Sequence, residues 1–116
     1  MSDPSAAAQL QAKLQALWES SKGMILERLE TLQAAHRQLS SDISDPHARQ
    51  QGLEAAHKLA GILGVFGMPE GSETASQIEH LLKQEQSLTQ ANLKPLHQLT
   101  EHLSTIIKAK SLNPNP

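Results

Sequence analysis

The sequence predicts an all-α protein, an antiparallel four-helix bundle of up-down-up-down topology with an additional N-terminal helix or helical extension. Apolar residues make up 38% of the 116 residues, Tyr is absent, and Trp18 and Phe66 are the only aromatic side chains. This Leu- and Ala-rich composition suits helices better than sheets, which favour aromatic and β-branched residues. Apolar residues also recur at three- and four-residue steps, the spacing of amphipathic helices. A chain of this length ordinarily forms one domain.

The first 40 residues carry one long amphipathic pattern after a polar start at residues 2–5. Gly23 either divides this segment into a short helix and a longer one, or lies within one continuous helix at a cost of about 1 kcal/mol. Both interpretations of residues 5–40 stay open. The pattern is defined by Leu10, Leu14, Leu17, Trp18, Ile25, Leu29, Leu32 and Leu39.

The second helix is expected to begin at Asp45 and Pro46, because a capping carboxylate precedes a proline of the first turn. It should run to about Gly67, and a turn at residues 68–71 leads into the third helix. That helix has an apolar side formed by Ala75, Ile78, Leu81 and Leu82.

The last helix follows a connector at residues 85–89. Pro95 fits best if this helix starts near Asn92, where a missing N–H costs little. The short connectors favour an antiparallel bundle. We therefore assign residues 1–110 to the bundle and residues 111–116 to a flexible tail or interdomain linker.

Composition and charge exclude several classes of function. The formal charge is −2 and there is no long basic run, so we expect no nucleic-acid partner. Cys is absent, which excludes disulfides and thiolate chemistry. No segment approaches 18 consecutive apolar residues and none resembles a signal peptide, so we expect a cytoplasmic protein without membrane contact. We also expect a monomer.

Chemistry is concentrated in residues 54–67 of the second helix, which combine one histidine with three glycines. Gly61 and Gly64 would each lower the stability of a helix by roughly 0.5–1 kcal/mol relative to Ala, so their presence requires an explanation. A helical projection places His57 at or beyond the edge of the apolar stripe, in a row whose next two turns carry no side chain. Its imidazole is therefore accessible, and near neutral pH a neutral imidazole is a nucleophile. The stripe consists of Ala56, Leu59, Leu63 and Phe66.

The run His57-Lys58-Leu59-Ala60-Gly61, followed by Gly64 and Gly67, resembles the signature of histidine-containing phosphotransfer (HPt) domains of two-component phosphorelays. Residues 50–80 carry most of this likeness. The sequence departs from the pattern at Ala60, where many members have Lys, and at Ile62 and Leu63, where small residues are common.

The resemblance implies a four-helix bundle in which His57 accepts a phosphoryl group and exchanges it with receiver-domain aspartates. It implies response-regulator receiver domains and a hybrid or sensor histidine kinase as partners, no autonomous catalysis, and no cofactor of its own, with Mg²⁺ supplied by the receiver. Lys58 lies about 100° around the helix from the histidine, so it reaches a phosphoryl group only if its long side chain bends. The expected docking surface and phosphate surroundings comprise Gln50, Leu53, Glu54, Lys58, Ala60, Gly61 and Gly64.

Other interpretations remain beside this one. The competing hypothesis is a non-catalytic helical interaction or dimerisation module, in which Gly61 and Gly64 only permit close helix packing. Leu53 can belong to the core or to the docking surface. Glu54 and Glu79 are expected to be solvated charges, and Trp18 and Phe66 packing residues. No metal site is expected, since no two of the six histidines have the i, i+4 spacing.

Overall fold

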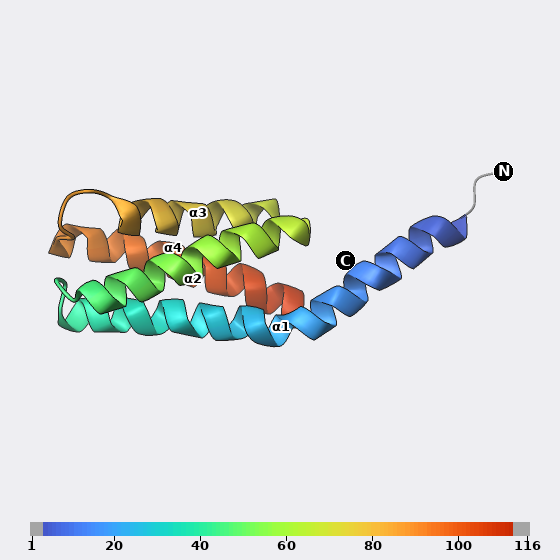
Figure 1. The fold of residues 1–116 in the computed structure, drawn as a ribbon, viewed down its shortest axis with the longest axis horizontal. Helices are drawn as coiled ribbons and strands as arrows, with labels where there is room; N and C mark the ends of the chain where they lie inside the picture. The colour runs from blue at the N-terminus through green and yellow to red at the C-terminus, as the bar shows by residue number, and fades with distance from the viewer. Residues whose placement is uncertain (1–3, 113–116) are drawn as a thin grey trace.

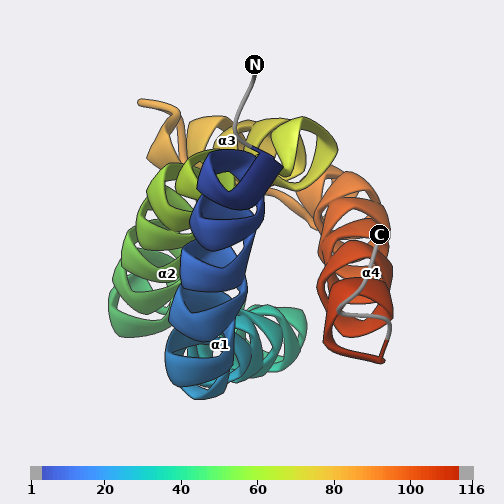
Figure 2. The same cartoon turned by 90° about the vertical axis from the view of Figure 1, so that its right-hand side faces the viewer.

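The computed structural model describes the backbone of residues 4–112. Four helices and no strand occur in this range (Figure 1): α1 (Pro4–Ser41), α2 (Pro46–Val65), α3 (Pro69–Lys83) and α4 (Gln90–Leu112). Helix α1 packs on α2 and α4, and α3 packs on the same two, so the helices form a ring in chain order. The view along the long axis in Figure 2 shows this arrangement. The predicted antiparallel four-helix bundle is confirmed.

Helix α1 is one continuous helix of 38 residues, which decides the question left open by Gly23. Gly23 is exposed, and a Cβ atom there would meet nothing within 4 Å. Figure 1 shows that the first part of α1 projects beyond the bundle and that the helix changes direction where it leaves it. Trp18 is the first buried side chain of α1, and Ser20, Ser21 and Gly23 follow it; Ser and Gly are residue types common at helix bends. The predicted N-terminal addition is thus an extension of α1.

Helix α2, which carries His57, has well-defined ends. At its start, Oδ1 of Asp45 accepts hydrogen bonds of 3.0 Å from the backbone N–H groups of His47 and Ala48. The bond from Ala48, with one from the Gln38 side chain, lowers the pKa of Asp45. At its end, Gly67 adopts a φ of 68° and the helix stops at Val65. This helix therefore has the predicted start and ends two residues early.

Two predicted boundaries of the last helix were wrong. Helix α4 begins at Gln90 instead of Asn92, so Pro95 lies in its second turn and leaves one backbone carbonyl without its usual donor. The start is held by Asn92, whose Oδ1 accepts a 2.8 Å hydrogen bond from the N–H of Thr89. The helix also continues to Leu112, two residues into the predicted tail. Residues 113–116 lie outside the described part of the chain.

The core is built from the apolar stripes of all four helices. Trp18 is buried and its ring meets that of Phe66 edge-on, with centroids 5.3 Å apart, so both are packing residues as predicted. Close helix contact depends on two glycines that the sequence analysis did not single out. A Cβ at Gly52 would lie 3.1 Å from Leu82, and one at Gly71 would lie 3.2 Å from Leu63. These glycines allow α2 and α3 to pack closely.

Arg49 fastens α2 to the end of α3 and the connector that follows. Its guanidinium donates hydrogen bonds to the backbone carbonyls of Leu82, at 2.8 Å, and of Gln84 and Gln86. Carbonyls at a helix C-terminus otherwise lack a partner within the protein. This side chain therefore fixes where the polypeptide leaves α3.

We expect Arg49→Ala to lower the free energy of unfolding by about 2 kcal/mol, because hydrogen bonds from a charged donor to part-buried carbonyls are lost. A urea titration followed by the fluorescence of Trp18, the sole tryptophan, measures the change. Arg37 of α1 provides the matched control because it is exposed and forms no ion pair within residues 4–112: Arg37→Ala should shift stability by less than about 0.5 kcal/mol. Equal effects of the two substitutions would contradict this role for Arg49.

His36 of α1 and His97 of α4 lie together although they are far apart in the sequence. Their ring centroids are 5.1 Å apart, and burial together with the charge of His97 lowers the pKa of His36. Within residues 4–112, no three His, Asp or Glu side chains gather in a way that could hold a metal ion. In the same range, no helix is both long enough and apolar enough to cross a bilayer.

Candidate functional site

His57 projects from the outer face of α2. The buried positions of this helix are on the opposite side, including Ala56 and Leu59, each 0% exposed. The imidazole side chain is 72% exposed. The helical projection placed the histidine at or beyond the edge of the apolar stripe, and in the structure it lies well beyond that edge.

The ring of His57 is held by a carboxylate of the neighbouring helix. Its Nδ1 lies 2.7 Å from Oε2 of Glu79 on α3, and the Glu79 side chain is only 22% exposed. A carboxylate can only accept a hydrogen bond, so Nδ1 carries the hydrogen. In the neutral ring, the lone pair then resides on Nε2. The expectation that Glu79 is merely a solvated charge was wrong.

A shallow groove of about 200 Å³ surrounds the histidine between α2 and α3. It contains both acidic and basic side chains, so its charges are balanced. Lys83, which the sequence analysis overlooked, contributes a cation from α3, one turn after Glu79. Lys58 contributes the second cation from α2. The groove is lined by Leu53, Glu54, His57, Lys58, Glu79 and Lys83.

Gly61 and Gly64 continue the row of His57 towards the C-terminus of α2, and both are exposed. A Cβ atom at Gly61 would meet nothing within 4 Å, and one at Gly64 would meet only the Ser72 hydroxyl, at an ordinary 3.5 Å. Helix packing therefore does not require either glycine. Close helix packing within the described part of this chain depends instead on Gly52 and Gly71, whereas packing of Gly61 or Gly64 against another molecule stays an alternative.

The departures from the HPt pattern have different consequences. Leu63 is buried and Ile62 is half-buried, so both contribute mainly to packing. Ala60 is half-buried, and its backbone carbonyl accepts a 2.7 Å hydrogen bond from the hydroxyl of Ser72, which joins α2 to α3. A cation is absent at position 60, and Lys83 supplies one from the neighbouring helix.

The remaining predicted site residues lie on the same outer face of α2. Gln50 and Glu54 are exposed and bonded to each other, with Nε2 of Gln50 donating to Oε1 of Glu54 at 3.1 Å. Leu53 is half-buried, because it packs against the core and also lines the groove. Lys58 is exposed and reaches both this groove and a second one between α1 and α2. All eight residues named from the sequence therefore occur around one surface of α2, and two of them, Leu53 and Ala60, are half-buried.

Comparison with known protein families matches residues 16–109 to a family model described as the Hpt domain. The chain belongs to the Hpt domain family. Hpt domains are phosphocarrier modules of phosphorelays, so histidine phosphotransfer is the function class of this protein. The matched range contains the four-helix bundle and the whole His57 groove, whereas most of the projecting part of α1 precedes it.

One curated protein illustrates the similarity. Protein RcaC of Microchaete diplosiphon is 34% identical over 71 residues, an alignment that covers 61% of this chain and 11% of that protein. The chain thus spans about a tenth of the length of this relative. No solved structure is a significant match.

Proposed function

We propose that His57 is the phosphoryl acceptor of this Hpt domain and that it exchanges phosphate with receiver-domain aspartates. The observation that carries this proposal is the geometry of the imidazole: 72% exposed, with Nδ1 bonded to Glu79 and Nε2 left available. No other described histidine combines this exposure with a bare glycine row.

In the transfer step, the lone pair of His57 Nε2 attacks the phosphorus of a receiver's aspartyl phosphate. The Nε2–P bond forms while the bond from phosphorus to the aspartate oxygen breaks, and the aspartate leaves as a carboxylate. Positive charge develops on the imidazole, and the Glu79 carboxylate at Nδ1 stabilises it. The same step in reverse transfers the phosphoryl group from His57 to the aspartate of a second receiver.

The groove offers cations for the phosphoryl oxygens but few free ligands for a metal. Lys58 and Lys83 line it, whereas Glu79 and Glu54 are hydrogen-bonded to His57 and Gln50. Mg²⁺ prefers several oxygen ligands in octahedral geometry. We expect no metal to bind in this groove, and we expect the acidic pocket of the receiver to supply the Mg²⁺ that neutralises the phosphoryl oxygens.

The docking surface for receivers is the outer face of α2. Leu53, Gly61 and Gly64 provide a low apolar surface around the histidine, and Gln50, Glu54 and Lys58 form its polar rim. Such a surface suits transient binding of modest area, which permits exchange between partners. A hybrid or sensor histidine kinase is the upstream source of the phosphoryl group.

We expect Glu79→Ala to slow phosphotransfer roughly 10- to 100-fold, by analogy with metal-ligating histidines that lose the hydrogen-bond partner of their other ring nitrogen. Glu79→Gln should lose less, since its amide oxygen can still accept from Nδ1 and orient the ring. Rapid-quench measurement of transfer from a phosphorylated receiver gives the rates. Glu73→Ala, an exposed change on the same helix, is the control and should leave the rate unchanged. An unaltered rate in Glu79→Ala would exclude a positioning role.

The direct test of the function is transfer of radiolabel from phosphorylated receivers to the purified protein. Labelling that is acid-labile and alkali-stable indicates a phosphoramidate on histidine and supports the proposal. Failure to become labelled against a broad panel of receivers, each shown to label a known Hpt domain, would favour the non-catalytic interaction module.

A further inference from the structure

The projecting part of α1 carries an apolar stripe that the bundle does not cover. Leu10, Leu14 and Leu17 are 60%, 40% and 50% exposed, and Met24 is 39% exposed. Every described side chain from Ser5 to Leu14 is exposed. Most of this segment precedes residue 16, where the match to the Hpt family begins, so the family's common function does not account for it.

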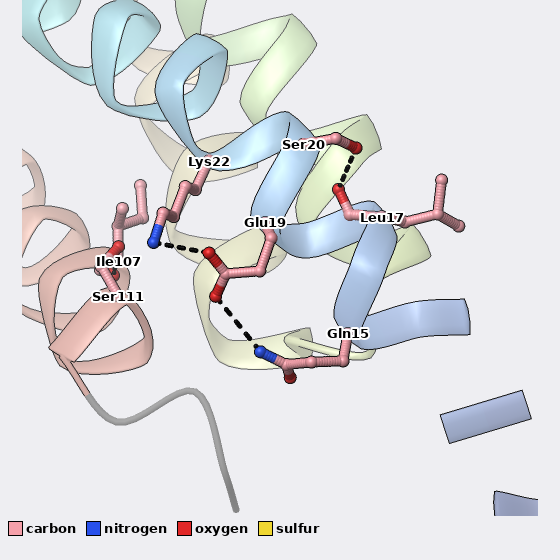
Figure 3. A network of polar contacts seen from close by, with 7 residues as sticks. All are labelled: Gln15, Leu17, Glu19, Ser20, Lys22, Ile107 and Ser111. Atoms are coloured by element: carbon pink, nitrogen blue, oxygen red, sulfur yellow. Dashed lines mark hydrogen bonds and ion pairs between the residues drawn. The ribbon is translucent and has the colours of Figure 1, made fainter. Parts of the chain in front are cut away.

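The stripe has the spacing of a coiled-coil seam. Its positions alternate by steps of three and four residues, which is a seven-residue repeat rather than the pattern of a lone surface helix. Figure 3 shows that Leu17 points away from α4, whereas the ion pair of Glu19 with Lys22, 2.7 Å long, lies on the side that faces α4. The seam therefore lies on a separate face, and its positions are Ala7, Leu10, Leu14, Leu17, Ser21 and Met24.

We propose that a second copy of this chain covers the seam, with the two α1 helices antiparallel. A two-fold axis at the level of residues 19–20 sets Leu14 of each copy beside Met24 of the other and brings the two Leu17 side chains to the centre. Because α1 has its first buried side chain at Trp18, the two bundles then extend in opposite directions from near the axis, and the projecting part of each α1 lies along the exposed side of the other copy's α1.

The charges beside the seam favour this orientation. Lys13 and Glu27 lie at equal distances before and after Ser20 in the sequence, and both occupy the same position of the seven-residue repeat. The two-fold axis therefore places each Lys13 beside Glu27 of the other copy. Neither side chain forms an ion pair within residues 4–112. A parallel pair would leave Lys13 opposite Trp18, without an acidic partner.

The end of the bundle adds apolar surface near the axis. Val65, the last residue of α2, is 69% exposed, and the adjacent Phe66 packs against Trp18 of α1. The end of α2 therefore exposes one further apolar side chain, next in sequence to a residue that contacts α1. The proposed dimer replaces the expectation of a monomer.

Sedimentation equilibrium of the full chain, from roughly 5 to 500 µM, tests the proposal because dimer formation depends on concentration by mass action. We expect a monomer–dimer equilibrium, weakened at least about tenfold by Leu14→Glu, which buries a charge in the seam. Ala12→Glu adds the same charge on the opposite face of α1 and should change nothing. Circular dichroism verifies that each variant remains folded.

Charge reversal tests the orientation. Lys13→Glu should weaken the dimer, and the double variant Lys13→Glu with Glu27→Lys should restore it. A monomer at all concentrations, or a dimer indifferent to Leu14→Glu, would overturn the proposal. A dimer that is weakened by Lys13→Glu and not restored by the double variant would overturn the antiparallel arrangement.

Discussion

His57→Gln should reduce phosphoryl acceptance from a phosphorylated receiver to background, a loss of roughly three orders of magnitude or more. The reason is that without the imidazole no covalent phosphohistidine can form. The amide of glutamine can still donate a hydrogen bond to Glu79, so the contact between α2 and α3 is largely kept. Because the histidine is 72% exposed, its replacement should change stability little.

The structure offers a close control for this substitution. His102 is also exposed, at 50%, and also bonds a glutamate of a neighbouring helix, with its Nε2 3.0 Å from Oε1 of Glu70. His102→Gln should transfer phosphate at the wild-type rate. Rapid-quench assays of both variants give the comparison, and label that survives in His57→Gln but disappears in His102→Gln would reverse the assignment.

We expect Gly61→Leu to slow phosphotransfer by roughly 10- to 100-fold, because a branched side chain one turn from His57 prevents the close approach that in-line transfer needs. Stability should move in the opposite direction. A Cβ at position 61 meets nothing, so Gly61→Ala should raise the free energy of unfolding by about 0.5–1 kcal/mol. Together these two results would mean that Gly61 lowers the stability of the protein but raises the rate of phosphotransfer. A glycine with that combination of effects serves function rather than packing.

Gly52→Ala is the matched control, since it changes a glycine of the same helix on the buried side. Its Cβ would lie 3.1 Å from Leu82 and 3.2 Å from Ala35, and we expect a loss of about 1–3 kcal/mol from overpacking. Transfer per folded molecule should stay normal. Urea titrations measure the stabilities of the variants, and transfer assays measure their rates. A Gly61→Leu protein that transfers phosphate at the wild-type rate would show that phosphotransfer does not need a glycine beside His57.

Local patterns were sufficient to predict the bundle and the outward direction of His57. The apolar repeat and the Asp45-Pro46 start depend on residues close in sequence, and the structure retains both. The early start of the last helix has a local cause, because the Asn92 side chain caps a start that Pro95 would disfavour. Helix ends are decided by such individual side-chain contacts.

The features that the sequence did not predict depend on contacts between different helices. Glu79 is 22 positions from His57 in the chain, and only the register of α3 against α2 brings them within 2.7 Å. The same holds for Arg49, whose carbonyl partners lie at the end of another helix. Gly52 differs from Gly61 only in the face on which it lies, so its packing role could be inferred only from its place among buried residues.

The most direct measurement is ¹⁵N NMR of the protein labelled on its histidines and phosphorylated by a receiver, with long-range ¹H–¹⁵N correlations that identify each ring nitrogen. We expect the phosphoryl group on Nε2 of His57, with Nδ1 still protonated and hydrogen-bonded to Glu79. Phosphorylation on Nδ1, or on any other residue, would contradict the assignment of His57 and the role given to Glu79.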